Sequence, residues 1–379
     1  MKEPVEARVD LDAVRANVAV LRERAAGADV MAMVKAEGYG HGLVASARAA
    51  LDGGATWIGV ARVAEALRLR AAGVTAPVLV AVATRGEPYE DAVAAGVDLT
   101  VGSAWLVKRL VTAAERTGRA ARVHLKADTG LSRGGATPAD WPGTVDAALA
   151  AQAAGHLEIV GLMSHLACAD EPGHPSVGRQ LAEFRDALDH AEKAGVRPQV
   201  RHLANSAGLL TLPEARYDLV RPGIAIYGLT PIPQEGSFGL RPAMTLVAEL
   251  AGVKRVPAGS GVSYGHTYVT DRETNLGLVA AGYGDGVPRH GSSLLEVLVD
   301  GRRHRIAGRV CMDQFVVDLG DDAPRAGDEV LLFGPGDRGE PTAQDWADAL
   351  GTISYEIVTR IGARVPRVFT GGAEGTVDG

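Results

Sequence analysis

The sequence is poor in aromatic residues, in cysteine and in positive charge. Phe, Trp and Tyr make up 4% of its 379 residues, and it has two cysteines, Cys168 and Cys311. Two cysteines in so long a chain do not indicate a disulfide framework, so we expect two free thiols in a reducing compartment. Lys and Arg total 39 against 46 acidic residues, a net charge of -7, with no basic tail. This balance argues against nucleic acid as a partner and favours a cytoplasmic protein.

Long apolar runs are also missing. No stretch approaches membrane-spanning length, and the N-terminal "MKEPVEARVD" carries charges where a signal peptide needs an apolar core. We therefore expect no membrane association and no export. Hydrophobic residues nevertheless make up 46% of the chain, enough for a large core, and the length suggests about two or three domains.

Over the first two-thirds of the chain, short apolar runs alternate with Ala-rich helical stretches, which is typical of βα units. The predicted strands are 29–35, 56–61, 77–82, 97–101, 122–128, 159–165, 200–205 and 217–223. Eight unbroken parallel repeats favour a closed (β/α)8 barrel over an open doubly wound sheet. We therefore expect an α/β protein with an N-terminal barrel over residues 8–240, its first helix capped by Asp10.

From residue 241 the pattern changes to short alternating strands with glycine turns, interrupted by one helical stretch, "TAQDWADALG" (342–351). This pattern is typical of a mainly antiparallel β domain, which we expect over 241–379, with residues 1–7 packing against it. The Pro- and Gly-rich segment 231–242 is the expected hinge. The polar C-terminal tail, 371–379, is expected to fray.

Polar residues gather at the C-terminal ends of five predicted strands. They are Lys35, Lys126 with Asp128, His165, Asn205 with Ser206, and Arg221. Each alone has a plain structural interpretation, since most lysines are solvated and a single buried histidine usually serves packing. In a barrel, however, these strand ends converge on the face where active sites lie. Their joint placement predicts a site.

Lys35 ends an apolar run and opens a glycine-rich segment, "MVKAEGYGHG" (33–42). Burial would lower the pKa of its amine and make the neutral form available for Schiff-base chemistry. Glycines let backbone N–H groups approach a phosphate closely. Pyridoxal 5′-phosphate, an aldehyde with a phosphate, meets both demands. A Schiff-base aldolase without cofactor is the rival, but it would not explain the tyrosine motif "VSYGHTY" (262–268) in the second domain.

Nine motifs, in the family's order and spanning nearly the whole chain, resemble those of bacterial alanine racemases. They are "MVKAEGYGHG", "KADTGLSRGG", "MSHLACAD", "HLANSAG", "VRPGIAIYG", "VSYGHTY", "GYGDGVPR", "GRVCMDQ" and "SYEIVTRIGARVPRVF". The resemblance implies a pyridoxal-phosphate enzyme that interconverts L- and D-alanine, supplies D-alanine for peptidoglycan and acts as a cytoplasmic homodimer.

The resemblance also implies a two-base mechanism. Lys35 matches the lysine that carries the cofactor and serves the D-enantiomer, and Tyr264 matches the base that serves the L-enantiomer from the second subunit. Because a tyrosine ordinarily ionises only near about pH 10, positive neighbours are needed, and His165 and Arg221 match them. Arg221 also matches the arginine that faces the pyridine nitrogen. An arginine donates only, so that nitrogen should stay unprotonated, which favours racemisation over transamination.

The remaining roles come from the same resemblance. The residues implied to bind the cofactor are Lys35, Tyr39, His165, Asn205, Ser206, Arg221, Gly223, Ile224 and Tyr355. Arg133 and Met312 match groups that contact the substrate carboxylate, the latter from the partner subunit. Lys126 matches a lysine that is carbamylated in many relatives. No metal ion is expected.

The opening motif departs from the commoner family form, which has Asn or Asp and then Ala where this chain has Glu37 and Gly38. Glu37 has no assigned role, and His41 is interpreted as structural. Three alternatives remain: a racemase of a related amino acid such as serine, a barrel-type pyridoxal-phosphate decarboxylase, and a cofactor carrier without catalysis. Arg221 and Tyr264 argue against the decarboxylase, which generally uses a glutamate and a cysteine there, and the second domain argues against the carrier.

Overall fold

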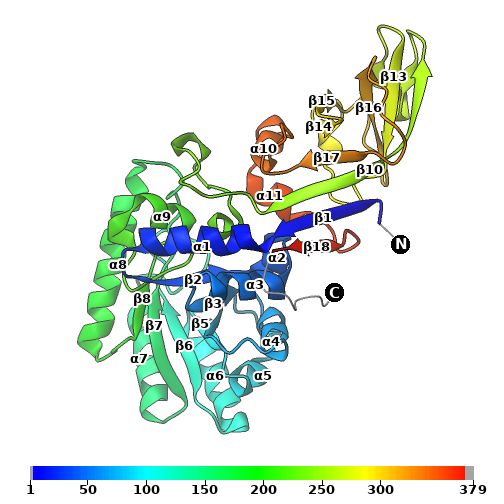
Figure 1. The fold of residues 1–379 in the computed structure, drawn as a ribbon. Helices are drawn as coiled ribbons and strands as arrows, with labels where there is room; N and C mark the ends of the chain where they lie inside the picture. The colour runs from blue at the N-terminus through cyan, green and yellow to red at the C-terminus, as the bar shows by residue number, and fades with distance from the viewer. Residues whose placement is uncertain (1–2, 372–379) are drawn as a thin grey trace.

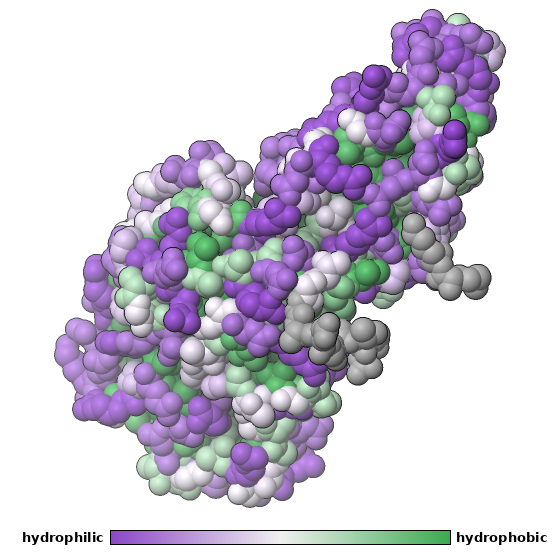
Figure 2. Space-filling view, in the orientation of Figure 1, coloured by the Kyte–Doolittle hydropathy of each residue, from purple (hydrophilic) through white to green (hydrophobic). Residues whose placement is uncertain are grey.

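The computed structural model describes residues 3–371, so residues 372–379, most of the tail expected to fray, lie outside it. Within this range the chain forms two eight-stranded sheets and a two-stranded hairpin (Figure 1). Between residues 3 and 371 no helix is both long and apolar enough to cross a bilayer. Hydrophilic residues dominate the face seen in Figure 2, over both parts of the molecule.

The first sheet is the predicted barrel. Its strands are β2 (Asp29–Met33), β3 (Trp57–Val60), β4 (Val78–Val80), β5 (Asp98–Val101), β6 (Ala121–Lys126), β7 (Leu157–Met163), β8 (Val200–His202) and β9 (Leu219–Val220). All neighbours are parallel, in the order β8-β7-β6-β5-β4-β3-β2-β9. Two backbone bonds join the outer strands' ends, Asp218 N–H to Arg201 O (3.1 Å) and Arg221 N–H to Ala204 O (2.9 Å). The (β/α)8 prediction is therefore confirmed.

Helices cover the outside of this sheet. They are α1 (Leu11–Ala25), α3 (Leu43–Asp52), α4 (Val63–Ala71), α5 (Tyr89–Ala94), α6 (Ala104–Thr117), α7 (Trp141–Ala153), α8 (Pro175–Ala194) and α9 (Ser206–Thr211). The spacing of apolar residues explains their packing: α8 buries Val177, Leu181, Phe184 and Leu188 on one stripe. The Asp10 carboxylate accepts the Ala13 N–H at 3.0 Å, so the predicted cap of α1 is confirmed.

The second sheet lies beside the barrel and is mainly antiparallel, as predicted. Its strands are β1 (Val5–Asp10), β10 (Met244–Val256), β13 (Thr274–Val279), β14 (Glu296–Val299), β15 (Arg302–Arg305), β16 (Phe315–Gly320), β17 (Glu329–Phe333) and β18 (Arg367–Thr370). β10 leads out of the barrel with β1 antiparallel to it (Figure 1), and β18 pairs parallel to β1. Both chain ends therefore join this sheet.

Two helices and a hairpin complete the second sheet's domain. The predicted helix is α10 (Ala343–Leu350), and a further one, α11 (Ser354–Thr359), was not predicted. The hairpin pairs β11 (Gly261–Val262) with β12 (Tyr268–Val269), and a 3-10 turn, η4 (Tyr264–His266), lies between them. α11 packs against α2 (Lys35–Tyr39) of the barrel, so the second domain contacts the segment that begins at Lys35.

Candidate active site

A cavity of about 800 Å³ opens at the C-terminal ends of the barrel strands. Every residue with a role implied by the resemblance, except Tyr264 and Met312, lines it: Lys35, Tyr39, Lys126, Arg133, His165, Asn205, Ser206, Arg221, Gly223, Ile224 and Tyr355. Asp128, which was also predicted at these strand ends, does not line it, and its carboxylate accepts the Gly130 and Ser132 N–H groups at 3.0 Å. Tyr264 and Met312 belong to the second domain, where their exposed fractions are 71% and 54%. The fold of one chain thus brings eleven predicted residues together and leaves two on its surface.

Four of the lining residues are cations, Lys35, Lys126, Arg133 and Arg221. Counting residues 3–371, none of them has a carboxylate oxygen within 4 Å. Burial, and then the charge of Arg133, lowers the pKa of Lys35. Burial, and then Arg221 and Arg133, lowers the pKa of Lys126 to about 8. The site therefore combines a strongly positive field with two amines whose pKa values are lowered, that of Lys126 to about 8.

Arg221 follows β9 and is held rigidly. Its Nη2 donates to the carbonyls of Ser164 (2.7 Å) and Leu203 (3.1 Å) and contacts His165 Nδ1 at 3.2 Å. Its Nη1 contacts His202 Nδ1 at 3.0 Å. Burial lowers the pKa of Arg221 to about 10, so the guanidinium stays charged at neutral pH. Because arginine only donates, His202 Nδ1 accepts from Nη1, which leaves the proton of that ring on Nε2.

The segment after Lys35 forms a left-handed turn. Ala36, Glu37, Gly38 and Tyr39 have φ values of 53°, 55°, 62° and 52°. For residues with a Cβ this conformation costs about 1–2 kcal/mol each, so other contacts must hold the turn. The strand itself ends at Met33, and Lys35 begins this turn.

Contacts from two elements, α4 and β18, hold the turn. Glu65 of α4 accepts the Ala36 N–H at 2.7 Å, and Arg68 of the same helix forms an ion pair with Glu37. From β18, Arg367 Nε donates to the Gly40 carbonyl at 2.8 Å. Glu37, which had no role in the sequence analysis, therefore ties the strained turn to α4. His41 stacks on Tyr227 with ring centroids 4.3 Å apart and is buried, in keeping with a structural role.

Tyr39 and Gly223 approach each other closely on one side of the cavity. A Cβ at position 223 would lie 2.2 Å from the Tyr39 hydroxyl, so only glycine fits here. Burial raises the pKa of Tyr39 and of Tyr355, so both phenols keep their protons and can donate to an anion. Ser206 Oγ accepts the Gly223 N–H at 2.9 Å. On this side of the cavity, neutral hydrogen-bond donors therefore surround the backbone at Gly223, which carries no side chain.

The sequence analysis missed His202, which contacts Arg221, and Trp105, which lines the cavity. It also missed His124 and Asp98, which continue from His202 into the barrel. A signal was present for three of them: Asp98, His124 and His202 are polar residues inside the predicted strands of a barrel. Such a residue inside a strand of a packed barrel needs a polar partner.

Two family models match the chain, the N-terminal domain of alanine racemase over residues 9–231 and its C-terminal domain over residues 243–369. The alanine racemase of Thermobifida fusca is 63% identical over 98% of this chain and 99% of its own length. That of Frankia casuarinae is 62% identical over 95% of each.

Solved structures agree. The alanine racemase of the D-cycloserine producer Streptomyces lavendulae superimposes with a TM-score of 0.97 at 56% identity, covering 99% of both chains. That of Streptomyces coelicolor A3(2) gives 0.96 at 57% identity, covering 97% of this chain and 98% of the other.

Proposed function

The chain belongs to the alanine racemase family of isomerases, and from that premise we propose that it interconverts L-alanine and D-alanine with pyridoxal 5′-phosphate as cofactor. The observation that carries the proposal is the cavity in which a buried lysine and three other cations face one space without carboxylate partners among residues 3–371. The D-alanine would supply peptidoglycan, and the enzyme would act in the cytoplasm, where its two free cysteines stay reduced.

The lining residues fit this cofactor. Gly223 has no side chain and the protonated phenol of Tyr39 lies against it, so backbone and hydroxyl can both face an anion such as a phosphate in the cavity. The residues that would hold the cofactor are Lys35, Tyr39, His165, Asn205, Ser206, Arg221, Gly223, Ile224 and Tyr355. When bound, pyridoxal phosphate supplies an aldehyde that condenses with an amine and a ring that stabilises negative charge at the substrate Cα.

Lys35 is one of the two proposed bases. Burial and Arg133 lower the pKa of its amine, which favours the neutral form that can bind the aldehyde and accept a proton from Cα. Racemisation requires a proton to leave one face of Cα and another to arrive on the opposite face, which one fixed base cannot do. A second group must therefore stand across from Lys35.

Tyr264 is the proposed second base, supplied by the partner of a homodimer. Its side chain is 71% exposed in the single chain, and it does not line this chain's cavity. Further large apolar side chains are exposed on the same domain, among them Tyr283, Met312 and Ile353. Exposed apolar residues of this size favour a partner surface. Met312 would reach the substrate carboxylate from that surface, beside Arg133.

In the proposed mechanism, Arg221 determines that negative charge remains near Cα and is reprotonated there. The guanidinium stays protonated at neutral pH and accepts no hydrogen bond, so it would keep a facing ring nitrogen unprotonated. Negative charge would then remain near Cα, where Lys35 or Tyr264 returns a proton promptly. Lys126 completes the proposal: its pKa near 8 supplies the neutral amine that carbamylation by CO2 requires, and the resulting anion would hold Arg133.

Exchange of the Cα hydrogen tests the proposal. The purified protein should be yellow and should exchange that hydrogen of both alanine enantiomers in D2O while interconverting them. Release of CO2 from either enantiomer, or a colourless protein without exchange, would contradict the proposal. A higher kcat/KM for serine than for alanine would reassign the substrate.

Mixing two inactive variants tests the shared site. Tyr264→Phe should lower racemisation by about 10²–10⁴-fold while the cofactor still binds, and Lys35→Ala should abolish it. If each site takes Lys35 from one subunit and Tyr264 from the other, mixed dimers hold one intact site. Co-refolding the two variants should then recover about a quarter of wild-type activity. No recovery in a verified mixed dimer would place both bases in one chain.

A further inference from the structure

Three polar side chains continue from Arg221 into the closed interior of the barrel. His202 on β8, His124 on β6 and Asp98 on β5 are all buried, with exposed fractions of 0%, 0% and 1%. His202 Nε2 lies 2.8 Å from His124 Nδ1, and His124 Nε2 lies 3.2 Å from Asp98 Oδ2. Together with the 3.0 Å contact between Arg221 and His202, these bonds connect the cavity to the opposite end of the barrel.

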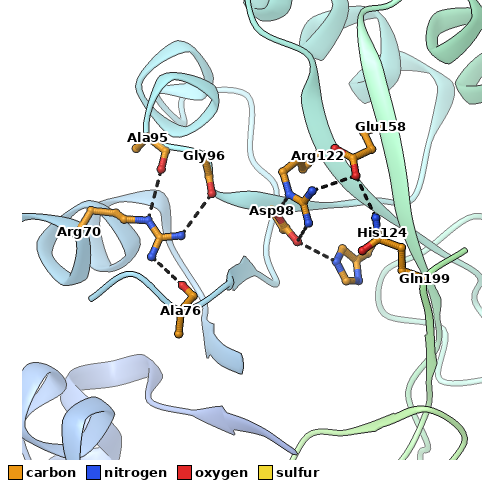
Figure 3. A network of polar contacts seen from close by, with 9 residues as sticks. All are labelled: Arg70, Ala76, Ala95, Gly96, Asp98, Arg122, His124, Glu158 and Gln199. Atoms are coloured by element: carbon orange, nitrogen blue, oxygen red, sulfur yellow. Dashed lines mark hydrogen bonds and ion pairs between the residues drawn. The ribbon is translucent and has the colours of Figure 1, made fainter. Parts of the chain in front are cut away.

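Figure 3 shows the far end of this chain of bonds. Arg122 Nε donates to Asp98 Oδ1 at 2.7 Å, and Arg122 Nη1 donates to Glu158 at 2.9 Å. Glu158 also accepts from Gln199 at 3.0 Å. Burial raises the pKa of Asp98, but the hydrogen bonds from His124 and Arg122 outweigh it and the pKa is lowered, so Asp98 is a carboxylate. The chain of bonds therefore has a cation at one end and an anion near the other.

The direction of every bond follows from Arg221. Since arginine cannot accept, His202 Nδ1 accepts, and its Nε2–H must donate to His124 Nδ1. His124 then carries its proton on Nε2 and donates it to Asp98. A protonated His124 would need an acceptor on His202, whose two nitrogens are already committed. Both histidines are therefore neutral, each in the Nε2–H form.

The backbone makes room for this arrangement. The register between β6 and β7 shifts between Val123 and His124. On β7, a Cβ at Gly161 would lie 2.3 Å from His124 Nδ1, so a side chain there would displace the ring. The two imidazoles meet edge to face, with centroids 5.0 Å apart at 82°. The register shift between β6 and β7 and the glycine at 161 thus make room for a histidine at an interior position that an apolar side chain could also fill.

We propose that Asp98 and His124 are positioning residues that act through His202 to fix the orientation of the Arg221 guanidinium and the direction in which it donates. Asp98 sets the proton positions of both rings, so that His202 presents only a lone pair to Arg221. The consequence for a ring nitrogen facing Arg221 rests on the proposed function. The proton positions do not, because they belong to the protein alone.

The first test reads the proton positions in the cofactor-free protein. With 15N-histidine labelling, His124 and His202 should both give the signals of the neutral Nε2–H tautomer from pH 6 to 8. Asp98→Asn should change the His124 pattern. Glu158→Gln, which removes a carboxylate that is bonded to Arg122 but to neither histidine, should not. A His124 imidazolium or Nδ1–H tautomer in the wild-type protein would overturn the proposal, whether or not any variant folds.

The second test uses the loaded enzyme. Asp98→Asn should lower kcat about tenfold with KM for alanine within about twofold, and should raise pyruvate formed per racemisation turnover about tenfold. Glu158→Gln should leave both quantities at wild-type values. An unchanged ratio in Asp98→Asn would overturn the proposal. Wild-type protein that neither binds the cofactor nor racemises alanine would instead defeat the proposed function and leave the tautomer test standing.

Discussion

The two ends of the barrel use charged side chains in opposite ways. At the N-terminal end, Arg122 bonds to Asp98 and Glu158, and Arg201 forms two bonds of 2.8 and 3.1 Å with Asp218. At the C-terminal end, the four cations around the cavity have no carboxylate within 4 Å in the part of the chain described. An unpaired buried charge costs stability, so the second arrangement does not serve folding and supports the proposed binding of an anionic cofactor.

The largest expected effect is the loss of racemisation when Lys35, at the C-terminal end of the barrel, is replaced. Lys35→Ala should lower racemisation by about 10⁴-fold or more, because in the proposed mechanism this one residue both binds the cofactor and moves a proton. The thermal midpoint of the cofactor-free variant should be equal to or above that of the wild type, since an unpaired cation is removed. Lys193→Ala, at an exposed lysine paired with Asp189 on α8, is the control and should keep full activity. Racemisation within tenfold of wild type in Lys35→Ala would contradict the comparison.

Adding a methyl group at Gly223 should weaken cofactor binding at the C-terminal end of the barrel without changing the charge there. Gly223→Ala places a Cβ 2.2 Å from the Tyr39 hydroxyl and must push the phenol aside. We expect pyridoxal phosphate to bind about 10–100-fold more weakly, as measured by titration of the cofactor-free protein. Gly178→Ala in α8, where a Cβ meets open space, should leave binding unchanged. Equal affinity in both variants would mean that the close contact between Gly223 and Tyr39 does not contribute to phosphate binding.

The pH dependence of stability should reveal the unpaired cations directly. The unfolded chain keeps the Lys126 proton up to about pH 10.5, whereas the folded protein releases it near about 8. The free energy of unfolding of the cofactor-free protein should therefore rise between these pH values, by about 3 kcal/mol from this residue.

Urea unfolding in carbonate-free buffer from pH 7.5 to 10 measures this rise. Lys126→Met should flatten it, because the group that titrates is gone. A rise of the same size in the variant would assign the effect to other groups.

The smallest effect is expected at the N-terminal end. Asp218→Asn should lower the free energy of unfolding by up to about 1 kcal/mol and leave racemisation unchanged. Its hydrogen bond with Arg201 lowers the pKa of Asp218, so this stabilisation is present above the ordinary carboxyl pKa and is lost as the pH falls through the folded value. Asp189→Asn, at a 3.8 Å exposed pair, should change neither quantity. A loss of racemisation in Asp218→Asn would show that the Arg201–Asp218 pair also serves the site.

Most of the barrel was predictable because its signals are local. Apolar runs of strand length and helical stripes such as that of α8 depend on neighbours a few residues away, and so does the cap at Asp10. The helix α11 escaped prediction because it is only six residues long, with a short apolar pattern. The left-handed turn after Lys35 also escaped, since Ala36 and Glu37 do not favour it and residues from α4 and β18 impose it.

The sequence by itself determined the order of the elements, the strand ends at which polar residues stand and the family to which the chain belongs. Only the tertiary structure decided that Glu37 pairs with Arg68, and that four cations share one cavity with no carboxylate within 4 Å among residues 3–371. It also decided that Arg221, His202, His124 and Asp98 form one chain of bonds. The reason is physical. Local propensity acts over a few residues, whereas burial, charge pairing and proton position depend on side chains from separate strands that meet only when the barrel closes.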